Sequence, residues 1–326
     1  MPRRPLLAAL ALALAGCVCL RHAVEKPERK AADCGREATK PGDHLCKVKV
    51  GNDERTFIVH VPGAPPREPK WTLVLAFHGV GSNAKQMAHI SNFSEVADRE
   101  RFLVVYPQGL GVVPAWNTAV VGKAKRSAAD EIEFVKTMLA ELHTLFAIDK
   151  TRIYATGFSN GGLLSHKIAC EMSETIAAIG VVAAINAEEE CLPIRPVPVL
   201  AFHGLRDPVV IFSGVEEIGL PSVRTTMKDW AVRDGCTEEP ELVEESGEVR
   251  CETWPGCRAS TEVTLCTVKE GHHTWPGGKN PSYMGHTTRD IDASDRLWAF
   301  FQKHPMPFEA TPAVTPVPTP AEGGAP

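Results

Sequence analysis

The chain lacks an excess of basic charge, a long hydrophobic run and an internal repeat. Its 326 residues include 35 basic and 40 acidic ones, a formal net charge of −5, and the basic residues are too scattered to form a nucleic-acid-binding face. The apolar run at 6–15 is far shorter than the roughly 20 residues that a membrane-spanning helix needs. No Cys-x-x-Cys pair occurs, which argues against a zinc ribbon. We therefore expect no nucleic-acid partner, no metal site and no cofactor.

The first 16 residues predict an export signal, because a basic start precedes the apolar run and small residues lead up to Cys17. The tetrapeptide LAGC at 14–17 resembles the lipobox of bacterial lipoproteins, in which the cysteine is lipidated and becomes the first residue. Ordinary signal cleavage with an unmodified Cys17 is the alternative. On the first interpretation, residues 17–44 are a lipid anchor and tether. The protein is then secreted or held at the cell surface, and we expect it to contact the membrane only through the lipid anchor.

Residues 45–305 alternate short apolar runs with longer amphipathic ones, which predicts one doubly wound α/β domain. The apolar runs are continuous, a pattern typical of strands that a parallel sheet buries on both faces. Ligands bind such sheets at the carboxyl ends of the strands. Residues 306–326 are rich in Pro, Ala and Thr, so we expect a disordered tail there. The expected strands are 71–79, 102–109, 152–157, 176–185, 197–204 and 262–268, and the expected helices are 91–100, 130–147, 162–173, 222–234 and 293–304.

The chain contains ten cysteines, a number that suits an oxidising compartment in which disulfides persist. Spacing alone does not determine their connectivity. A hairpin that pairs Trp254 with Val263 would place two cysteines opposite each other, and two further pairs are close in the sequence. The pairs we expect are Cys34–Cys46, Cys170–Cys191, Cys251–Cys266 and, from the remainder, Cys236–Cys257, with Cys19 left over.

The segment YATGFSNGG at 154–162 contains the pattern Gly-x-Ser-x-Gly, with Ser159 at its centre. It follows an expected strand and opens an expected helix, which is the context of a nucleophile elbow. Glycines on both sides permit a tight turn, and the helix N-terminus favours negative charge that develops at the serine. The alternative is a glycine-rich turn in which Ser159 only caps the helix. The strand-turn-helix context favours the nucleophile.

A serine nucleophile needs a base and an acid that orients the base. In α/β hydrolases these follow the serine in the order acid, then histidine. Asp207 lies just after the expected strand 197–204, in AFHGLRDPVV, and EGHHTWPGG at 270–278 supplies the histidine. Asp207 is therefore the expected acid.

The letters AFHG occur twice, at 76–79 and 201–204. The first copy ends an early strand, where hydrolases place a loop that donates one N–H to the oxyanion hole. We expect the N–H groups of Val80 and Asn160 to form that hole. His78 and His203 are expected to structure their loops rather than to catalyse.

These motifs, together with HGVGSN, GHHTWPGG and DASDRLWAFF, resemble the esterase family of feruloyl esterases, acetyl xylan esterases and secreted polyhydroxybutyrate depolymerases. The resemblance covers most of residues 50–303. It implies an α/β-hydrolase fold with a mostly parallel sheet. The family's usual motif, GGGHTWPG, implies that His273, directly before Thr-Trp-Pro, is the base. His272 stands where glycine is usual, and we expect it to narrow or polarise the substrate entrance.

Two tryptophans are candidates for lining the substrate site. Trp275 lies beside the expected base, and Trp116 stands in AWNT, where the family often has Trp-Asn near the site. A packing role is the alternative for both. Asp130 and Glu131 begin an expected helix, where carboxylates suit the helix dipole, so a structural role is expected for them.

Serine-ester hydrolysis is the function that these residues favour. Only the segment 186–196 separates two expected strands at the place where many lipases insert a lid domain, so we expect no large lid. An open site suits feruloyl or acetyl esters of polysaccharide, or a hydroxybutyrate polyester, acted on by a monomer. The alternatives are a serine peptidase of the same fold, which usually carries a propeller or cap, and a non-catalytic carbohydrate-binding surface lipoprotein. A metal site at His272 and His273 is disfavoured because adjacent side chains diverge.

Overall fold

The computed structural model describes residues 34–118, 130–188, 190–237 and 239–307. The expected signal peptide, Cys17, Cys19 and most of the tether lie outside the described residues, as do residues 308–326 of the expected tail. Within the described ranges, none of the helices combines the length and apolar character needed to cross a membrane.

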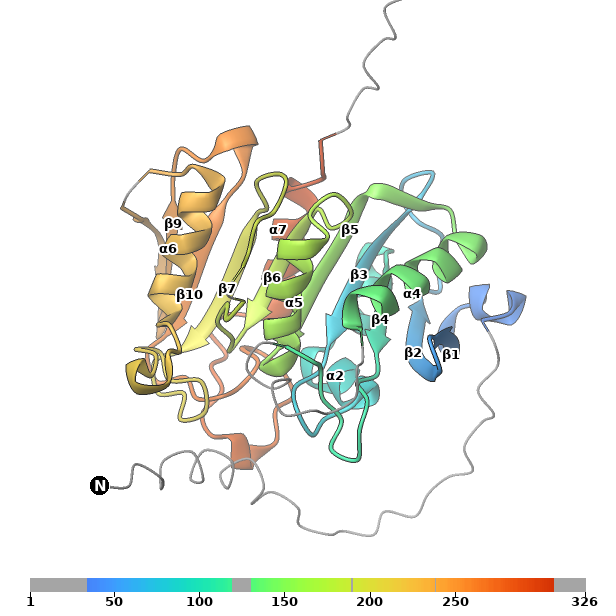
Figure 1. Cartoon of the computed structure of the whole chain (residues 1–326), viewed down its shortest axis with the longest axis horizontal. Helices are drawn as coiled ribbons and strands as arrows, with labels where there is room; N and C mark the ends of the chain where they lie inside the picture. The colour runs from blue at the N-terminus through green and yellow to red at the C-terminus, as the bar shows by residue number, and fades with distance from the viewer. Residues whose placement is uncertain (1–33, 119–129, 189, 238, 308–326) are drawn as a thin grey trace, which may run out of the picture. The chain divides into compact units, whose positions relative to one another are not determined.

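The described residues form a single mixed sheet in the strand order β1-β2-β4-β3-β5-β6-β7-β10-β9-β8 (Figure 1). The central strands, from β4 to β10, are parallel to one another. The outer strands β1, β2, β9 and β8 are antiparallel to their neighbours. The strands are β1 Gly42–Val50, β2 Asp53–Val61, β3 Trp71–Phe77, β4 Leu103–Pro107, β5 Ile148–Phe158, β6 Ala178–Val182, β7 Val199–Gly204, β8 Glu241–Ser246, β9 Val249–Trp254 and β10 Val263–Val268.

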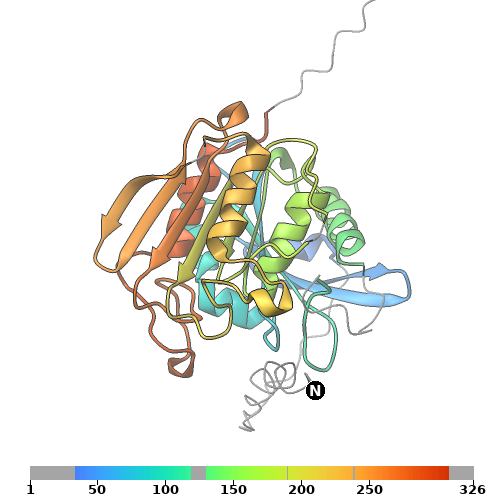
Figure 2. The same cartoon turned by 60° about the vertical axis from the view of Figure 1, so that its left-hand side comes forward.

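Helices cover both faces of the sheet, and each face has its own apolar core (Figures 1 and 2). Helices α4, α5 and α6 pack on one face, and α2, α3 and α7 pack on the other. The helices are α2 Ala84–Ser91, α3 Phe93–Glu100, α4 Glu131–Leu145, α5 Asn160–Glu171, α6 Val223–Asp234 and α7 Ala293–Lys303. Short 3-10 turns occur at Arg36–Thr39, Glu216–Ile218, Arg258–Ser260 and Ser282–Met284.

Side-chain caps fix where several of these helices begin. Asn83, Asp130 and Ser222 each accept a hydrogen bond from a backbone N–H in the first turn of α2, α4 and α6. Asp292 does the same at α7 through two N–H groups. Such a cap satisfies donors that have no partner within the helix. Asp130 therefore has the structural role that the sequence predicts, at the start of α4.

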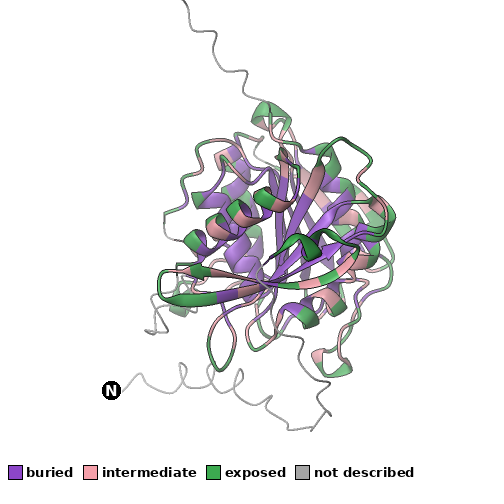
Figure 3. Ribbon diagram, turned by 90° about the vertical axis from the view of Figure 1, so that its right-hand side faces the viewer, coloured by how far each residue is buried: buried purple, intermediate pink, exposed green. Residues whose placement is uncertain are grey.

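The expected α/β-hydrolase architecture is confirmed, and no separate lid domain is present among the described residues. Each expected strand and helix lies within a few residues of its place. The sequence interpretation missed β1, β2, β8 and α2. In β1 and β8 polar residues interrupt the apolar ones; β1 is mostly half-buried and β8 is largely exposed. Figure 3 shows the exposed turn of the β1–β2 hairpin against the buried central strands.

The folded body begins before the expected boundary at residue 45. Cys34 and Ala38 are buried in the core, and β1 already begins at Gly42. Cys34 forms a disulfide with Cys46, which ties this segment to the sheet. The described residues contain the four pairs expected from the sequence, namely Cys34–Cys46, Cys170–Cys191, Cys236–Cys257 and Cys251–Cys266. The last pair lies in the hairpin register that joins Trp254 to Val263.

A buried carboxyl group at the end of α6 makes the fold sensitive to pH. Asp234 is fully buried, and its Oδ1 accepts a hydrogen bond from the Val197 N–H at 3.0 Å. Burial raises the pKa of Asp234 to about 7, because the Val197 N–H and the charge of Arg195 offset the lost hydration only in part. Since the native state then binds a proton more tightly than the unfolded chain, this group lowers stability as pH rises from its ordinary pKa of 3.8 to about 7.

We expect Asp234→Asn to stabilise the protein at pH 8 and to change stability little near pH 4. An asparagine keeps the acceptor for Val197 and never ionises. The stability difference from wild type should grow by about 1.4 kcal/mol per pH unit across the interval in which only the unfolded state is ionised. Chemical denaturation at several pH values measures it. Asp229→Asn, at an exposed position of the same helix, is the control, and equal pH profiles for both variants would contradict the assignment.

Candidate active site

Ser159 occupies a sharp turn between β5 and α5. Its backbone angles are φ 54° and ψ −119°, a region that costs energy for any residue with a side chain. The turn is possible because a Cβ at Gly157 would collide with the carbonyl of Gly161, and a Cβ at Gly161 would collide with the carbonyl of Phe77. The Ser159 side chain makes no hydrogen bond that caps α5. The capping-serine alternative is therefore wrong, and the geometry is that of a nucleophile elbow.

Asp207 and His273 meet at the same edge of the sheet. Asp207 lies in the turn after β7, and His273 lies in the loop after β10. The His273 Nδ1–H donates to Asp207 Oδ2 at 2.7 Å, and the Asp207 side chain is fully buried. Oδ1 of Asp207 accepts hydrogen bonds from the N–H groups of Val209 and Val210 at 2.8 and 2.9 Å. Both oxygens of the Asp207 carboxylate therefore accept hydrogen bonds that fix its orientation.

The pKa of Asp207 is lowered, so this group is ionised at neutral pH. Burial alone would raise the pKa, but the hydrogen bond and charge of His273, with smaller contributions from His203 and the Val209 N–H, outweigh it. An ionised acid that accepts the Nδ1–H leaves Nε2 of His273 as the basic nitrogen.

The imidazole of His273 lies beside the nucleophile turn. Its ring is 4.8 Å from the ring of Phe158, the residue directly before Ser159. Among the described residues no hydrogen bond joins the Ser159 hydroxyl to His273. Such bonds are often long in the absence of substrate and tighten when it binds. The structure therefore gathers the three expected residues at the carboxyl ends of β5, β7 and β10 (Figure 1).

His272 does not share this position. Its Nδ1–H donates to the backbone oxygen of Glu270 at 3.1 Å. Its ring lies against Gly285, where an added Cβ would be 2.6 Å from the His272 Cγ. The two adjacent histidines therefore face different neighbours, and His273 is the one that contacts Asp207. No group of three His, Cys, Asp or Glu side chains that could hold a metal occurs among the described residues.

The segments that carry the expected oxyanion donors flank Ser159. Val80 follows the end of β3, and the neighbouring Gly79 approaches so closely that an added Cβ would lie 3.4 Å from the Ser159 Cβ. Asn160 is the first residue of α5, where backbone N–H groups have no partner within the helix. Both segments thus lie where donors for a developing oxyanion are needed.

Neither tryptophan proposed as a substrate contact lines the site. Trp275 is fully buried, donates its indole N–H to the Ser294 hydroxyl at 3.0 Å and packs against Phe93. Trp116 is only 1% exposed. The expectation of substrate contact is wrong for both, and the packing alternative is correct, because tertiary partners satisfy each indole N–H inside the core.

The two AFHG histidines brace the loops that follow their strands. His78 Nδ1–H donates to the Gly79 oxygen at 2.7 Å, and its Nε2 accepts from the Gly109 N–H at 2.9 Å. Burial lowers the pKa of His78 to about 4, so the ring is neutral at neutral pH. His203 donates from Nε2 to the Val210 oxygen at 2.7 Å, and burial lowers its pKa as well. Both residues hold loops in place, as the sequence predicts.

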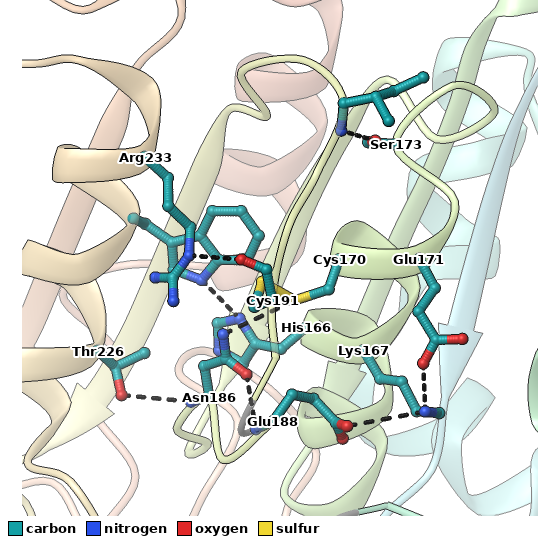
Figure 4. Close-up of a disulfide and its surroundings, with 12 residues drawn as sticks. His166, Lys167, Cys170, Glu171, Ser173, Asn186, Glu188, Cys191, Thr226 and Arg233 are labelled. Atoms are coloured by element: carbon teal, nitrogen blue, oxygen red, sulfur yellow. Dashed lines mark hydrogen bonds and ion pairs between the residues drawn. A yellow bond between two sulfur atoms is a disulfide. The ribbon is translucent and has the colours of Figure 1, made fainter.

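The expected Cys170–Cys191 disulfide lies among polar contacts, not expected from the sequence, that pack α5 against α6 and the chain after β6 (Figure 4). Cys170 on α5 forms a disulfide with Cys191. Nearby, the buried His166 accepts the indole N–H of Trp230 at 3.0 Å, and burial lowers the pKa of His166 to about 3. The disulfide therefore ties the C-terminal end of α5 to the chain after β6.

The chain is similar to known esterases. A family model described as esterase PHB depolymerase matches residues 57–227, which is more than half of the chain. The chain belongs to this esterase family.

Among curated relatives of this esterase, feruloyl esterase B of Piromyces equi is 30% identical over an alignment 239 residues long that covers 69% of this chain and 44% of that protein. The esterase therefore spans less than half the length of that relative. The putative esterase NocK of Nocardia uniformis subsp. tsuyamanensis is 27% identical over an alignment 275 residues long that covers 76% of this chain and 79% of that protein. The solved acetyl xylan esterase from Aspergillus awamori superposes with a TM-score of 0.58 at 15% identity, covering 79% of this chain and 98% of that one. At that identity the likeness shows the fold alone.

We expect His273→Ala to lower kcat by several orders of magnitude, and His272→Ala to act mainly on KM. Of the two adjacent histidines, His273 is the one that contacts Asp207, and loss of a triad member leaves little more than binding and the oxyanion hole. Steady-state kinetics on a short-chain aryl ester measures both variants. The assignment is wrong if His272→Ala is inactive while His273→Ala keeps its activity.

Proposed function

We propose that this esterase hydrolyses acyl esters through a covalent intermediate on Ser159, with His273 as general base and Asp207 as its orienting acid. The observation that supports this most directly is the 2.7 Å hydrogen bond between His273 Nδ1 and Asp207 Oδ2, next to a serine held in a strained turn. A serine hydroxyl is a weak nucleophile until such a base removes its proton.

The reaction proceeds in two similar halves. His273 Nε2 takes the proton of the Ser159 hydroxyl while the Ser159 oxygen attacks the acyl carbon. The resulting oxyanion lies between the N–H groups of Val80 and Asn160. The imidazolium then protonates the leaving alcohol, and a water molecule repeats the sequence to release the acid. Asp207 stays ionised throughout and stabilises the imidazolium.

The substrates we propose are feruloyl or acetyl esters carried by polysaccharide. The relatives named feruloyl esterase and the relative named bifunctional acetylxylan esterase/xylanase support this class. A hydroxybutyrate polyester is the second candidate, because the loops at the carboxyl edge of the sheet expose apolar side chains. They are Val112 and Val113 after β4, Leu205, Val209 and Ile211 after β7, and Tyr283 after β10.

We further propose that the esterase acts outside the cytoplasm as a monomer attached to a membrane through Cys17. Four disulfides among the described residues are typical of an oxidising compartment. The LAGC sequence at 14–17 supports the anchor.

A fluorophosphonate probe should label the purified wild-type protein on Ser159, and Ser159→Ala should abolish both labelling and hydrolysis. Peptide mass spectrometry identifies the labelled residue, and a panel of feruloyl, acetyl and hydroxybutyrate esters compares kcat/KM. Ser260→Ala, at an exposed serine, is the control and should be labelled normally. Absence of labelling in the wild type would favour the non-catalytic carbohydrate-binding alternative.

Mass spectrometry of the mature protein from a bacterial expression host should find a lipid-modified Cys17 as the first residue. Cys17→Ser should release the protein in soluble form. An unmodified terminus beyond residue 17 would show that the anchor does not exist and that the signal is cleaved in the ordinary way.

A further inference from the structure

Trp116 links the two segments that carry the expected oxyanion donors. Its backbone N–H donates to Asn160 Oδ1 at 2.7 Å, and its backbone oxygen accepts from Asn160 Nδ2 at 3.3 Å. Its indole N–H donates to the backbone oxygen of His78 at 2.7 Å. One residue is thus hydrogen-bonded both to the residue after the nucleophile and to the strand end that leads into Val80.

The contact with His78 fixes the position of the Val80 segment. His78 bonds to the oxygen of Gly79 and to the N–H of Gly109, and the ring of Trp116 lies 4.8 Å from the His78 ring. The same indole packs edge-on against Phe77 at 5.3 Å. The peptide groups just before Val80 therefore have little freedom to move relative to Trp116.

The other side of Trp116 is anchored to a buried ion pair. The N–H of the next residue, Asn117, donates to Glu131 Oε1 at 3.1 Å, and Glu131 Oε2 accepts from Arg55 Nη2 at 2.8 Å. Both charged side chains are only 1% exposed, and the Arg55 guanidinium lies 3.9 Å from the centre of the Phe134 ring. Glu131 lies on α4 and Arg55 lies on β2. The backbone next to Trp116 is therefore fixed to these two elements and does not move with the loop after β3.

We propose that Trp116 is a positioning residue that sets the spacing between the Val80 and Asn160 N–H groups in the oxyanion hole. It does not touch substrate, because its side chain is buried, so it acts through the two donors. The inference rests on the proposed esterase function. Oxyanion donors stabilise the transition state more than the ground state, so a change in their spacing lowers kcat and leaves KM nearly unchanged.

Replacing Trp116 by phenylalanine tests the proposal, with Trp230→Phe as the matched control. Trp230 on α6 is equally buried, and its indole N–H also donates to a buried acceptor, His166. We expect Trp116→Phe to lower kcat roughly 10- to 100-fold, with KM within about twofold of wild type. Its affinity for a boronic acid or trifluoromethyl ketone that mimics the tetrahedral intermediate should fall by the same factor. Trp230→Phe should lose comparable thermal stability and keep wild-type kcat.

A second variant covers the case in which Trp116→Phe does not fold. Benzothienylalanine at position 116 keeps the shape of the ring system and replaces the indole N–H with sulfur, which removes only the hydrogen bond to His78. This variant should show the same loss in kcat as Trp116→Phe, with KM unchanged. Equal kcat in the Trp116 and Trp230 variants, or a loss confined to KM, would overturn the proposal. Failure of the proposed function is distinct, because wild type itself would then hydrolyse no ester and bind no fluorophosphonate.

Discussion

The strained backbone of Ser159 is the constraint on which the rest of the site depends. A residue with φ 54° and ψ −119° persists only where the surrounding structure leaves no alternative. Here β5 is hydrogen-bonded to β3 and β6 up to the residues just before the turn, and α5 begins at the next residue. The energy that folding gains from the two cores on either side of the sheet therefore holds the serine at the carboxyl edge.

The groups proposed to act with Ser159, namely Asp207, His273 and the Val80 N–H, lie on loops. Hydrogen bonds within these loops must hold the groups in position. Buried histidines give that support on both sides. His78 organises the loop after β3, and His203 bonds to Val210, whose N–H in turn holds Asp207. Because burial lowers both pKa values, each ring is neutral near pH 7 and offers its hydrogen bonds without the cost of burying a charge.

The places of Ser159 in the turn before α5 and of Asp207 after β7 could be predicted from the sequence because their signals are local. The glycines of the Gly-x-Ser-x-Gly pattern predict the tight turn at Ser159, and Asp207 closely follows a continuous apolar strand. The choice of His273 over His272 required the family motif, since the two are equivalent in a local pattern. The sequence left packing and substrate contact open for Trp116 and Trp275, because their hydrogen-bond acceptors, the His78 oxygen and the Ser294 hydroxyl, are brought near only by the fold. The ion pair between Arg55 and Glu131, which are 76 positions apart, had no signal in the sequence.

The disulfides and the proposed catalytic groups occupy different parts of the described structure. None of the eight cysteines in the described disulfides lies on the loops that carry Val80, Ser159, Asp207 or His273. Instead the bonds fasten the N-terminal hairpin, the ends of α5 and α6, and the pair of strands β9 and β10. Cross-links stabilise a fold mainly by restricting its unfolded chain, so they can sit far from the chemistry. The site itself is held by short-range hydrogen bonds, which fix distances to fractions of an ångström, and catalysis depends on those distances.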